Sequence, residues 1–570
     1  MSGSCGSGSC WKHDGPSRDR GHPRRPLSSL PSERPWTAAE LAPSAPNLLS
    51  ARLPGGFVAA STGWVTPEQI EARLTPTEEA FERWRRRSGL VLAPAAFLMV
   101  WFLPIAGLNE SAHRLLAVMS VAVVLWMTEA IPMGATALVA PGLAVLCGVA
   151  PAKEAYRSFA DPIIFLFVGS FMLVEAMMRH GLNRRIAFGI LRLPGVGDSP
   201  LGLYAAFGFI TTFLSMWVSN AATTAMMLPI GIAIGAEVAR RESARTGREI
   251  HFTALPLATG LMLLTAFGAS VGGLATPIGT PPNLIGIGLI EKTLGRRISF
   301  FEWMRVGLPV SVVLGTFLVF NFHRRCPVAV ESLRGSAAWL EREAVHLGAW
   351  TRAQRVILWI FGLAILGWIL PGVLALVEGA DSARVKLLGA RMPESIVALM
   401  AAGVLFAWPV DWKSGRFVLE WRDAVKIDWG TIFLFAGGMA LGEQMFSSGL
   451  ARWVGDGVAG IFEARTEVSL TLLFTGVAVL VSEATSNTAS ATMIIPITIA
   501  VAQSAGVDPL KPALGACLGS SMGFLMPVST GPNAMVYGTG CVPLLRMFRH
   551  GLGLDAVGYV AIVLAVLTLA

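Results

Sequence analysis

Apolar stretches long enough to cross a bilayer follow one another from about residue 88 to the end of the chain. A transmembrane helix needs about 20 predominantly apolar residues. Charged residues make up only 14% of the sequence, whereas soluble domains carry about a quarter. Within hydrocarbon, every backbone polar group must be paired inside the protein, which leaves helices and closed barrels as the spanning structures. The length of the stretches predicts an all-α polytopic membrane protein.

The predicted spans are identified by apolar length alone. They lie at 88–106, 113–130, 132–150, 161–178, 304–322, 355–376, 394–409, 429–447 and 552–570. Four longer blocks carry polar interruptions, at 202–238, 253–290, 467–503 and 512–545. Residues 1–80 are rich in Ser, Gly, Pro and Arg and are predicted to form a disordered cytoplasmic tail. Residues 78–87 resemble a basic amphipathic helix at the membrane surface.

The second half of the apolar region resembles the first. Gly169, Glu175, Gly181, Leu182 and Arg184 match Gly437, Glu443, Gly449, Leu450 and Arg452, and Ser219, Asn220, Ala222, Met226, Pro229 and Ile230 match Ser486, Asn487, Ala489, Met493, Pro496 and Ile497. The two repeats are predicted at 161–322 and 429–570, with a cytoplasmic loop at 323–354. An odd number of crossings separates their starts, so the second repeat is inverted, as in secondary transporters with a shared site near the midplane.

The loop charges give the predicted orientation. Most basic clusters fall on the cytoplasmic side if the N-terminus is inside and each polar block returns to the side it entered. The C-terminus then lies outside. Two clusters oppose this scheme, at 292–297 and 384–391.

Two polar runs lie inside apolar blocks. Residues 482–490 carry seven oxygen-bearing side chains, and residues 216–224 repeat the Ser-Asn pair in a similar frame. Hydrocarbon tolerates such runs only where protein groups or a bound ion satisfy them. Each block is interpreted as a re-entrant helical hairpin with the run at its tip. Two short spans joined by a polar turn at the surface are the alternative.

A Pro- and Gly-containing run follows each hairpin, at 275–283 and at 527–533, and must break the helix there. A broken helix frees carbonyls that suit a hard monovalent cation and N–H groups that suit an oxyanion. A structural kink is the simpler alternative. None of the four polar runs contains Lys or Arg. An anion bound there would depend on helix ends and co-bound cations, which would couple the two.

Carboxylates inside predicted spans are functional candidates because ionised groups are costly in a membrane. They are Glu129, Asp161, Glu175, Glu443 and Glu483. Glu175 and Glu443 match between the repeats, which favours helix packing, and Glu483 adjoins the second polar run as a candidate proton or cation element. Metal-ligand spacing and nucleotide-binding loops are absent from the sequence, which argues against an ATP-driven pump. No cofactor or metal beyond a coupling ion is expected.

The paired motifs resemble those of the divalent anion/sodium symporter family, which carries dicarboxylates, citrate and sulfate. Ser486-Asn487-Thr488 matches the family's hairpin tip fully, Ser219-Asn220-Ala221 lacks the threonine, and residues 279–283 also fit. The similarity covers about 85–570. It implies about 11 transmembrane helices, two re-entrant hairpins, an elevator-type transport domain and a dimerising scaffold, to which 81–160 and 355–428 would belong.

The resemblance also implies the site residues. One sodium would be held by Ser215, Ser219, Asn220 and the Gly279 backbone, and a second by Ser482, Thr485, Asn487 and the Ser529 backbone. Substrate carboxylates would meet Ser219, Asn220, Thr280, Ser486, Asn487 and Thr488. Ala221 and Gly531 depart from the family pattern and affect substrate contacts more than cation contacts.

The predicted function is sodium-coupled import of a divalent anion across the inner membrane by a homodimer. A C4-dicarboxylate such as succinate, malate or fumarate is the first choice of substrate. Sulfate or citrate as substrate, proton coupling and anion exchange stay open, and a channel is a further alternative. Neither enzymatic activity nor nucleic-acid binding is expected.

Overall fold

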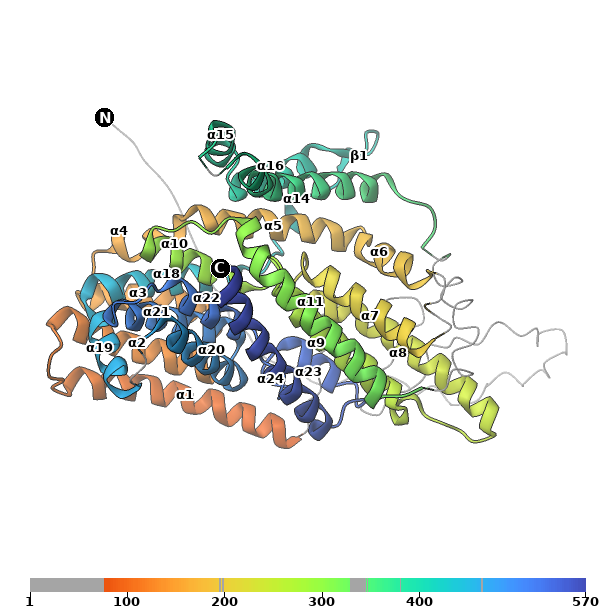
Figure 1. The fold of residues 1–570 in the computed structure, drawn as a ribbon, viewed down its shortest axis with the longest axis horizontal. Coiled ribbons are helices and arrows are strands. Elements are labelled where there is room, and N and C mark those ends of the chain that lie inside the picture. Colours follow the sequence, from red (N-terminus) through yellow and green to blue (C-terminus); the bar gives the residue numbers. More distant parts are fainter. Residues whose placement is uncertain are drawn as a thin grey trace, which may run out of the picture. The chain divides into compact units, whose positions relative to one another are not determined.

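The computed structural model describes residues 76–193, 196, 199–328, 345, 347–379, 381–462 and 465–570. These residues are almost entirely helical (Figure 1). Among them, the β structure is confined to a short antiparallel pair, β1 (Pro409–Asp411) and β2 (Arg416–Phe417), in which Pro409 lies opposite Phe417. The all-α fold predicted from the sequence is confirmed.

The first helix extends further towards the N-terminus than predicted. Helix α1 (Pro76–Phe102) joins the predicted surface helix and the first predicted span into one element. The last five residues of the predicted disordered tail, 76–80, are therefore helical, and residues 1–75 lie outside the described part of the chain. The helix continues because no proline occurs between Pro76 and Pro94, so no backbone donor is missing over the junction.

Helices α2 (Glu110–Thr128) and α3 (Met133–Leu146) follow, and the short α4 (Ala152–Ala155) and η2 (Arg157–Ala160) lead to the first repeat. That repeat comprises α5 (Pro162–Arg179), α6 (Leu182–Leu191), α7 (Pro200–Ser215), α8 (Asn220–Thr246), η3 (Phe252–Ala254), α9 (Pro256–Gly273), α10 (Pro281–Leu294) and α11 (Phe300–Arg325). The segment between the repeats holds α14 (Arg352–Glu378), α15 (Ala383–Arg391), α16 (Glu394–Ala407) and α17 (Trp421–Ala424), together with the β pair.

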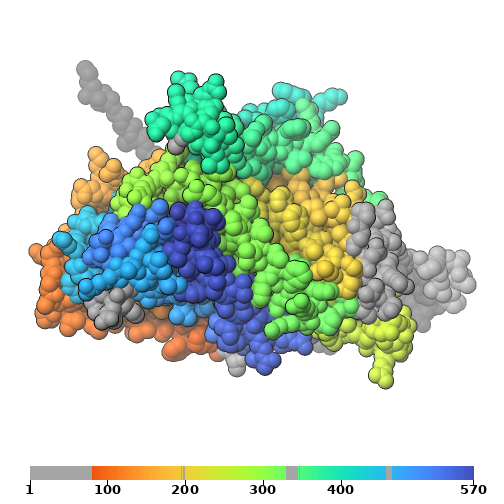
Figure 2. Space-filling model, viewed as in Figure 1, coloured from red at the N-terminus to blue at the C-terminus, as the bar shows by residue number. Residues whose placement is uncertain are grey.

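The second repeat presents the same succession of α-helices as the first. It comprises α18 (Trp429–Ser448), α19 (Leu450–Phe462), α20 (Glu467–Ala484), α21 (Asn487–Ser504), α22 (Leu510–Gly519), α23 (Gly531–Tyr537) and α24 (Leu544–Leu569). Each repeat therefore contains a helical pair followed by a broken helix and a long closing helix. The closing helices α11 and α24 pack against each other, and Figure 2 shows them side by side in green and dark blue.

Eight described helices are long and apolar enough to cross a membrane, or nine if the bent pair α15 and α16 counts as one span. This is fewer than the predicted number of about 11. The two counts cover different helices. The length and hydropathy test leaves out α1, α3, α18 and the broken helix α22–α23, which lie in predicted spans, and it includes the hairpin arms α8 and α20, which the prediction did not count as spans.

Burial differs strongly among the long helices. In the most apolar 18-residue stretch of α9, 94% of the residues are buried, whereas in that of α14 only 17% are buried. A helix that is apolar all round and buried belongs to the core, whereas an apolar helix that remains exposed in a membrane protein faces lipid or another subunit. Helix α9 packs against α7, α8 and α11 of its own repeat and against α23 of the other. The two repeats thus share one core.

Matching glycines allow two close helix crossings. A Cβ atom on Gly169 of α5 would lie 2.6 Å from the Ala398 carbonyl carbon of α16, and one on Gly437 of α18 would overlap the Ala137 carbonyl oxygen of α3. Small residues at such crossings permit backbone contact between membrane helices. The repeat match between Gly169 and Gly437 therefore reflects equivalent packing positions.

We expect Gly437→Ala to destabilise the protein by about 1–3 kcal/mol, because the added methyl group must displace backbone. Gly362→Ala on α14 is the matched control, since nothing lies within 4 Å of a Cβ at that position. Thermal unfolding in detergent measures both variants. Equal melting temperatures for the two would contradict the close crossing of α3 and α18.

Candidate ion-binding site

Each repeat contains a tight connection between two helices, which we call its tip. The first tip (216–219) joins α7 to α8, and the second tip (485–486) joins α20 to α21. Ser219 and Ser486 occupy the N-cap positions, where their Oγ atoms accept the backbone N–H groups of Ala222 at 3.3 Å and Ala489 at 3.2 Å. A serine at this position satisfies a donor that the first helical turn leaves unpaired.

The asparagine that follows each serine is held in the same way in both repeats. Ser215 donates its hydroxyl to Asn220 Oδ1 at 2.8 Å, and Ser482 donates to Asn487 Oδ1 at 2.9 Å. These four residues occupy equivalent repeat positions. Each pair sets the orientation of an amide at the start of a helix, where the positive end of the helix dipole also lies.

Each repeat also contains a broken helix. The first break (274–280) separates α9 from α10, and the second break (520–530) separates α22 from α23. Carbonyls freed by the interruption are paired by an asparagine side chain. Asn283 Nδ2 donates to the Gly273 and Thr276 carbonyls at 2.8 and 2.7 Å, and Asn533 Nδ2 donates to the Gly523 and Met526 carbonyls, both at 3.0 Å.

Tip and break touch at a glycine in both repeats. A Cβ atom on Gly273 would lie 2.6 Å from Asn220 Oδ1, and one on Gly523 would lie 2.8 Å from Asn487 Oδ1. Real Cβ contacts are longer, so any other residue would push the tip away. The same two glycine positions lie close to Thr280 in the first repeat and Ser529 in the second.

The predicted site residues therefore gather into two half-sites. The first half-site comprises Ser215, Asn220, Gly279 and Thr280, and the second comprises Ser482, Asn487 and Ser529. Thr485 is turned away from this set, with its hydroxyl donated to the Val481 carbonyl at 2.8 Å. Ser219 is exposed and Ser486 and Thr488 are half-buried, so these three remain accessible beside the amides.

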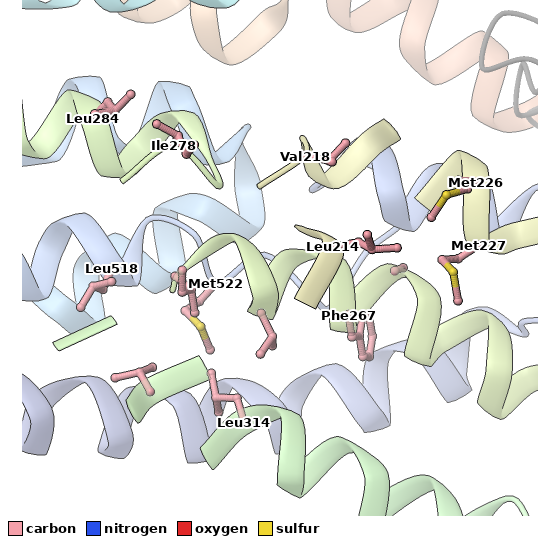
Figure 3. Close-up of a cluster of buried hydrophobic side chains, with 14 of the residues drawn as sticks. Leu214, Val218, Met226, Met227, Phe267, Ile278, Leu284, Leu314, Leu518 and Met522 are labelled. Carbon is pink, nitrogen blue, oxygen red and sulfur yellow. The ribbon is translucent and has the colours of Figure 1, made fainter. Parts of the chain in front are cut away.

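Each break region packs against the opposite repeat. Cys517, just before the second break, donates its thiol to the Pro282 carbonyl at 3.1 Å, and the Phe267 and Phe524 rings meet edge to face at 5.2 Å. Helix α10 also packs against α21, and α23 packs against α8. Figure 3 shows Phe267, Leu518 and Met522 in one apolar cluster that includes both repeats.

A cavity of about 530 Å³ reaches the first break. Its walls come from α5, α10 and α16 and include Pro277. Lys292 of α10 lies at this cavity and forms ion pairs with Asp161 at 3.4 Å and with Glu443 at 3.0 Å. Two of the intramembrane carboxylates singled out in the sequence therefore share one cation. Glu175 and Glu443 match between the repeats and are predicted to share a helix-packing role. Their surroundings differ, because Glu443 pairs with Lys292.

The half-sites differ in charge. Glu483 adjoins the second half-site and accepts the Phe524 N–H at 2.6 Å, the Leu525 N–H at 3.0 Å and the Ser529 hydroxyl at 3.0 Å. The first repeat has Met216 at the equivalent position. Neutral oxygens with a single nearby carboxylate form a set that suits small monovalent cations better than a multivalent metal.

The family model described as the sodium:sulfate symporter transmembrane region matches residues 85–569. The chain belongs to the sodium:sulfate symporter family. Among its relatives, the sodium-dependent dicarboxylate transporter SdcS of Staphylococcus saprophyticus is 32% identical over 483 residues, which cover 84% of this chain and 90% of the relative. SdcS of Staphylococcus aureus is 31% identical over 482 residues. The resemblance inferred from the Ser-Asn motifs is thereby confirmed.

Two solved transporter structures are distantly similar to this symporter-family chain. The YdaH transporter of Alcanivorax borkumensis is 14% identical with a TM-score of 0.45, over 72% of this chain and 85% of the other. MtrF of Neisseria gonorrhoeae is 11% identical with a TM-score of 0.45, over 73% and 82% of the two chains. Similarity at this level assigns no residue of the half-sites.

Asn283→Ala and Asn533→Ala should each lower the unfolding free energy by about 1–3 kcal/mol, because each removes two hydrogen bonds to carbonyls of a break. Asn183→Ala is the control, since that amide donates to the Met178 sulfur at 3.5 Å and accepts the N–H of the adjacent Arg184 at 2.9 Å, and neither contact involves a break. Melting temperatures in detergent report the result. A lower melting temperature in only one of the two asparagine variants would show that the two breaks are stabilised by different interactions.

Proposed function

We propose that this symporter-family chain is a secondary active transporter that carries a divalent anion together with sodium. The observation that supports the proposal is the equivalent geometry of the two half-sites, in which a Ser-Asn tip touches a broken helix at a glycine. Inverted repeats with broken helices are the arrangement by which secondary transporters build a shared site. The names of the relatives support sodium as the coupling ion.

The cation ligands in this proposal are neutral oxygens. One sodium is held by Ser215, Ser219, Asn220 and the Gly279 backbone, and a second by Ser482, Thr485, Asn487 and the Ser529 backbone. Hydroxyl, amide and carbonyl oxygens at helix ends suit a hard monovalent cation. The second sodium requires Thr485 to exchange its bond to the Val481 carbonyl for the ion, so this half-site rearranges on binding.

The anion then binds beside the cations. Substrate carboxylates meet Ser219, Asn220, Thr280, Ser486, Asn487 and Thr488, at the N-terminal ends of α8, α10 and α21. Helix N-termini favour anions. Because the four polar runs contain no Lys or Arg, the anion gains most of its charge compensation from the bound sodium ions. Binding of one solute therefore promotes binding of the other, which is the thermodynamic basis of coupling.

The substrate class in this proposal is a C4-dicarboxylate such as succinate, malate or fumarate. The relatives named as dicarboxylate transporters support this choice. The protein would act as an inner-membrane homodimer with its N-terminus in the cytoplasm and its C-terminus outside. An elevator mechanism requires a mobile transport domain beside a scaffold. The cavity at the first break is lined by α5 and α10 of the first repeat and by α16 of the predicted scaffold, which supports this part of the proposal.

Uptake by purified protein in proteoliposomes tests the function directly. Labelled succinate should accumulate against its gradient when sodium is high outside, and labelled sulfate should accumulate less. Uptake that needs a proton gradient or internal anion in place of sodium would contradict symport with sodium. Flux without accumulation would indicate a channel.

Asn487→Ala should abolish sodium-dependent uptake, because the amide is shared between the second cation site and the substrate. If some uptake remains, the sodium concentration that gives half-maximal uptake should rise by more than about tenfold. This corresponds to a loss of about 1.4 kcal/mol of sodium-binding free energy. Asn321→Ala on α11 is the control, since that amide pairs with His550 away from both half-sites. Wild-type sodium dependence in Asn487→Ala would show that the second cation site is wrongly placed.

A further inference from the structure

The basic cluster at 292–297 opposes the predicted orientation, because Lys and Arg are favoured on the cytoplasmic side. A cluster retained on the other side needs an explanation of its own. In the structure, each of its basic side chains forms an ion pair with an acid from another part of the chain. Lys292 pairs with Asp161 at 3.4 Å and with Glu443 at 3.0 Å, Arg296 pairs with Asp508 at 2.8 Å, and Arg297 pairs with Glu394.

The two acids that meet Lys292 belong to helices fixed to the predicted scaffold. Asp161 caps α5, whose backbone lies against α16 at Gly169. Glu443 lies on α18, whose backbone lies against α3 at Gly437. Helices α3 and α16 are both part of the predicted scaffold. Lys292 lies on α10, the helix that begins at the first break, so its ion pairs join a helix of the first half-site to the scaffold.

Charged side chains, rather than close packing, form this contact. The cavity of about 530 Å³ lies between α5, α10 and α16, and Lys292 and Asp161 line it. The side chains of Lys292, Asp161 and Glu443 are 27%, 20% and 24% exposed. Water can therefore replace a lost partner, yet the pairs are shielded enough to be stronger than fully exposed ones. Arg297 and Glu394 form a further, more exposed pair at the same cavity.

The acids of this contact occur in both repeats, but the lysine occurs in only one. Asp161 matches Asp428, and both aspartates cap their helices, α5 and α18. Glu443 matches Glu175. The second-repeat equivalent of α10 and the loop after it, residues 532–545, contains neither Lys nor Arg. Helix capping therefore does not require Lys292. Because inverted repeats exchange the two sides of the membrane, a cation in one repeat acts on one side alone.

We propose that Lys292, Asp161 and Glu443 form an ionic latch, which holds α10 against the scaffold in the arrangement seen here. Ser158 on η2 donates its hydroxyl to Glu443 at 2.8 Å and so helps to orient the acid. Movement of α10 relative to α5 and α18 breaks both ion pairs of Lys292. The latch therefore favours this arrangement over the alternative one in the transport cycle, and the inference rests on the proposed function. Lys292 is a positioning residue that sets the balance between the two arrangements.

Pulsed electron paramagnetic resonance tests the latch in protein reconstituted into nanodiscs without substrate. Spin labels are placed at Arg248→Cys, just after α8, and at Ser414→Cys, between β1 and β2, where both side chains are exposed. Native cysteines that are not buried are replaced by serine. The distance distribution then reports the half-site helices relative to the scaffold. Lys292→Gln should raise the ratio of the alternative to the latched population by about three- to tenfold, because two half-buried ion pairs are lost.

Arg296→Gln is the matched control. It removes an ion pair at the same end of α10, but Asp508 lies between α21 and α22, which carry the second tip and lead to the second break. Both partners therefore belong to the half-site helices, and the population ratio should not change. Asp161→Asn keeps a good cap for α5 and removes one acid of the latch. It should shift the ratio in the same direction as Lys292→Gln, but by less.

Charge exchange separates the electrostatic role from a structural one. Lys292→Glu should shift the ratio at least as far as Lys292→Gln, and adding Glu443→Lys should reverse most of that shift. Wild-type ratios in both single variants would overturn the latch, as would an equal shift in Arg296→Gln or no reversal in the double variant. A shift that depends on the latch, in protein without sodium-dependent uptake, would refute the proposed function and leave the ion-pair effect standing.

Discussion

Pairing of backbone groups freed inside a membrane protein is the constraint on which the structure depends. A helix broken at membrane depth leaves backbone carbonyls without their helical donors. Asn283 and Asn533 each donate two hydrogen bonds from one amide to these carbonyls, seven and ten residues back along the chain. Because the side chain completes the interrupted ladder, the breaks persist as defined structures, and the oxygens that remain unpaired are available to ligands.

The repeated design also explains why the sites are built from neutral groups. Each repeat contributes a tip and a break, and each break packs against the other repeat through contacts such as Cys517 with Pro282. Basic side chains in such a core would need permanent partners of their own. In the proposed mechanism, cations that come and go supply the positive charge, so the affinity for the anion varies with sodium.

Much of the site could be predicted from the sequence because its elements are local. Ser-Asn at a helix start and Pro-Asn after a break carry their conformations in a few residues, and the repeat shows each of them twice. The touching glycines could have been found in the same way, since Gly273 and Gly523 also match between the repeats. Their role could not, because a contact with Asn220 or Asn487 depends on how separate helices cross.

Other features depend on tertiary packing that no local pattern encodes. Lys292 and Glu443 lie far apart in the chain, and only the fold brings them together at 3.0 Å. The extent of α1 was also predicted imperfectly, because apolar length does not distinguish a continuous helix from two adjoining elements. The asymmetry between Met216 and Glu483 was visible in the sequence, but its meaning required the hydrogen bonds of the second break.

The glycine contacts between tips and breaks also limit how such a protein can move. Asn220 and Asn487 lie against Gly273 and Gly523 with no room for a side chain between them, and hydrogen bonds within each tip hold the amides in place. A half-site so tightly assembled does not open by swinging its tip outward without dismantling its own ligand shell. In the proposed transport cycle, cargo exposed first to one side of a bilayer and then to the other would therefore travel together with its ligands as one body.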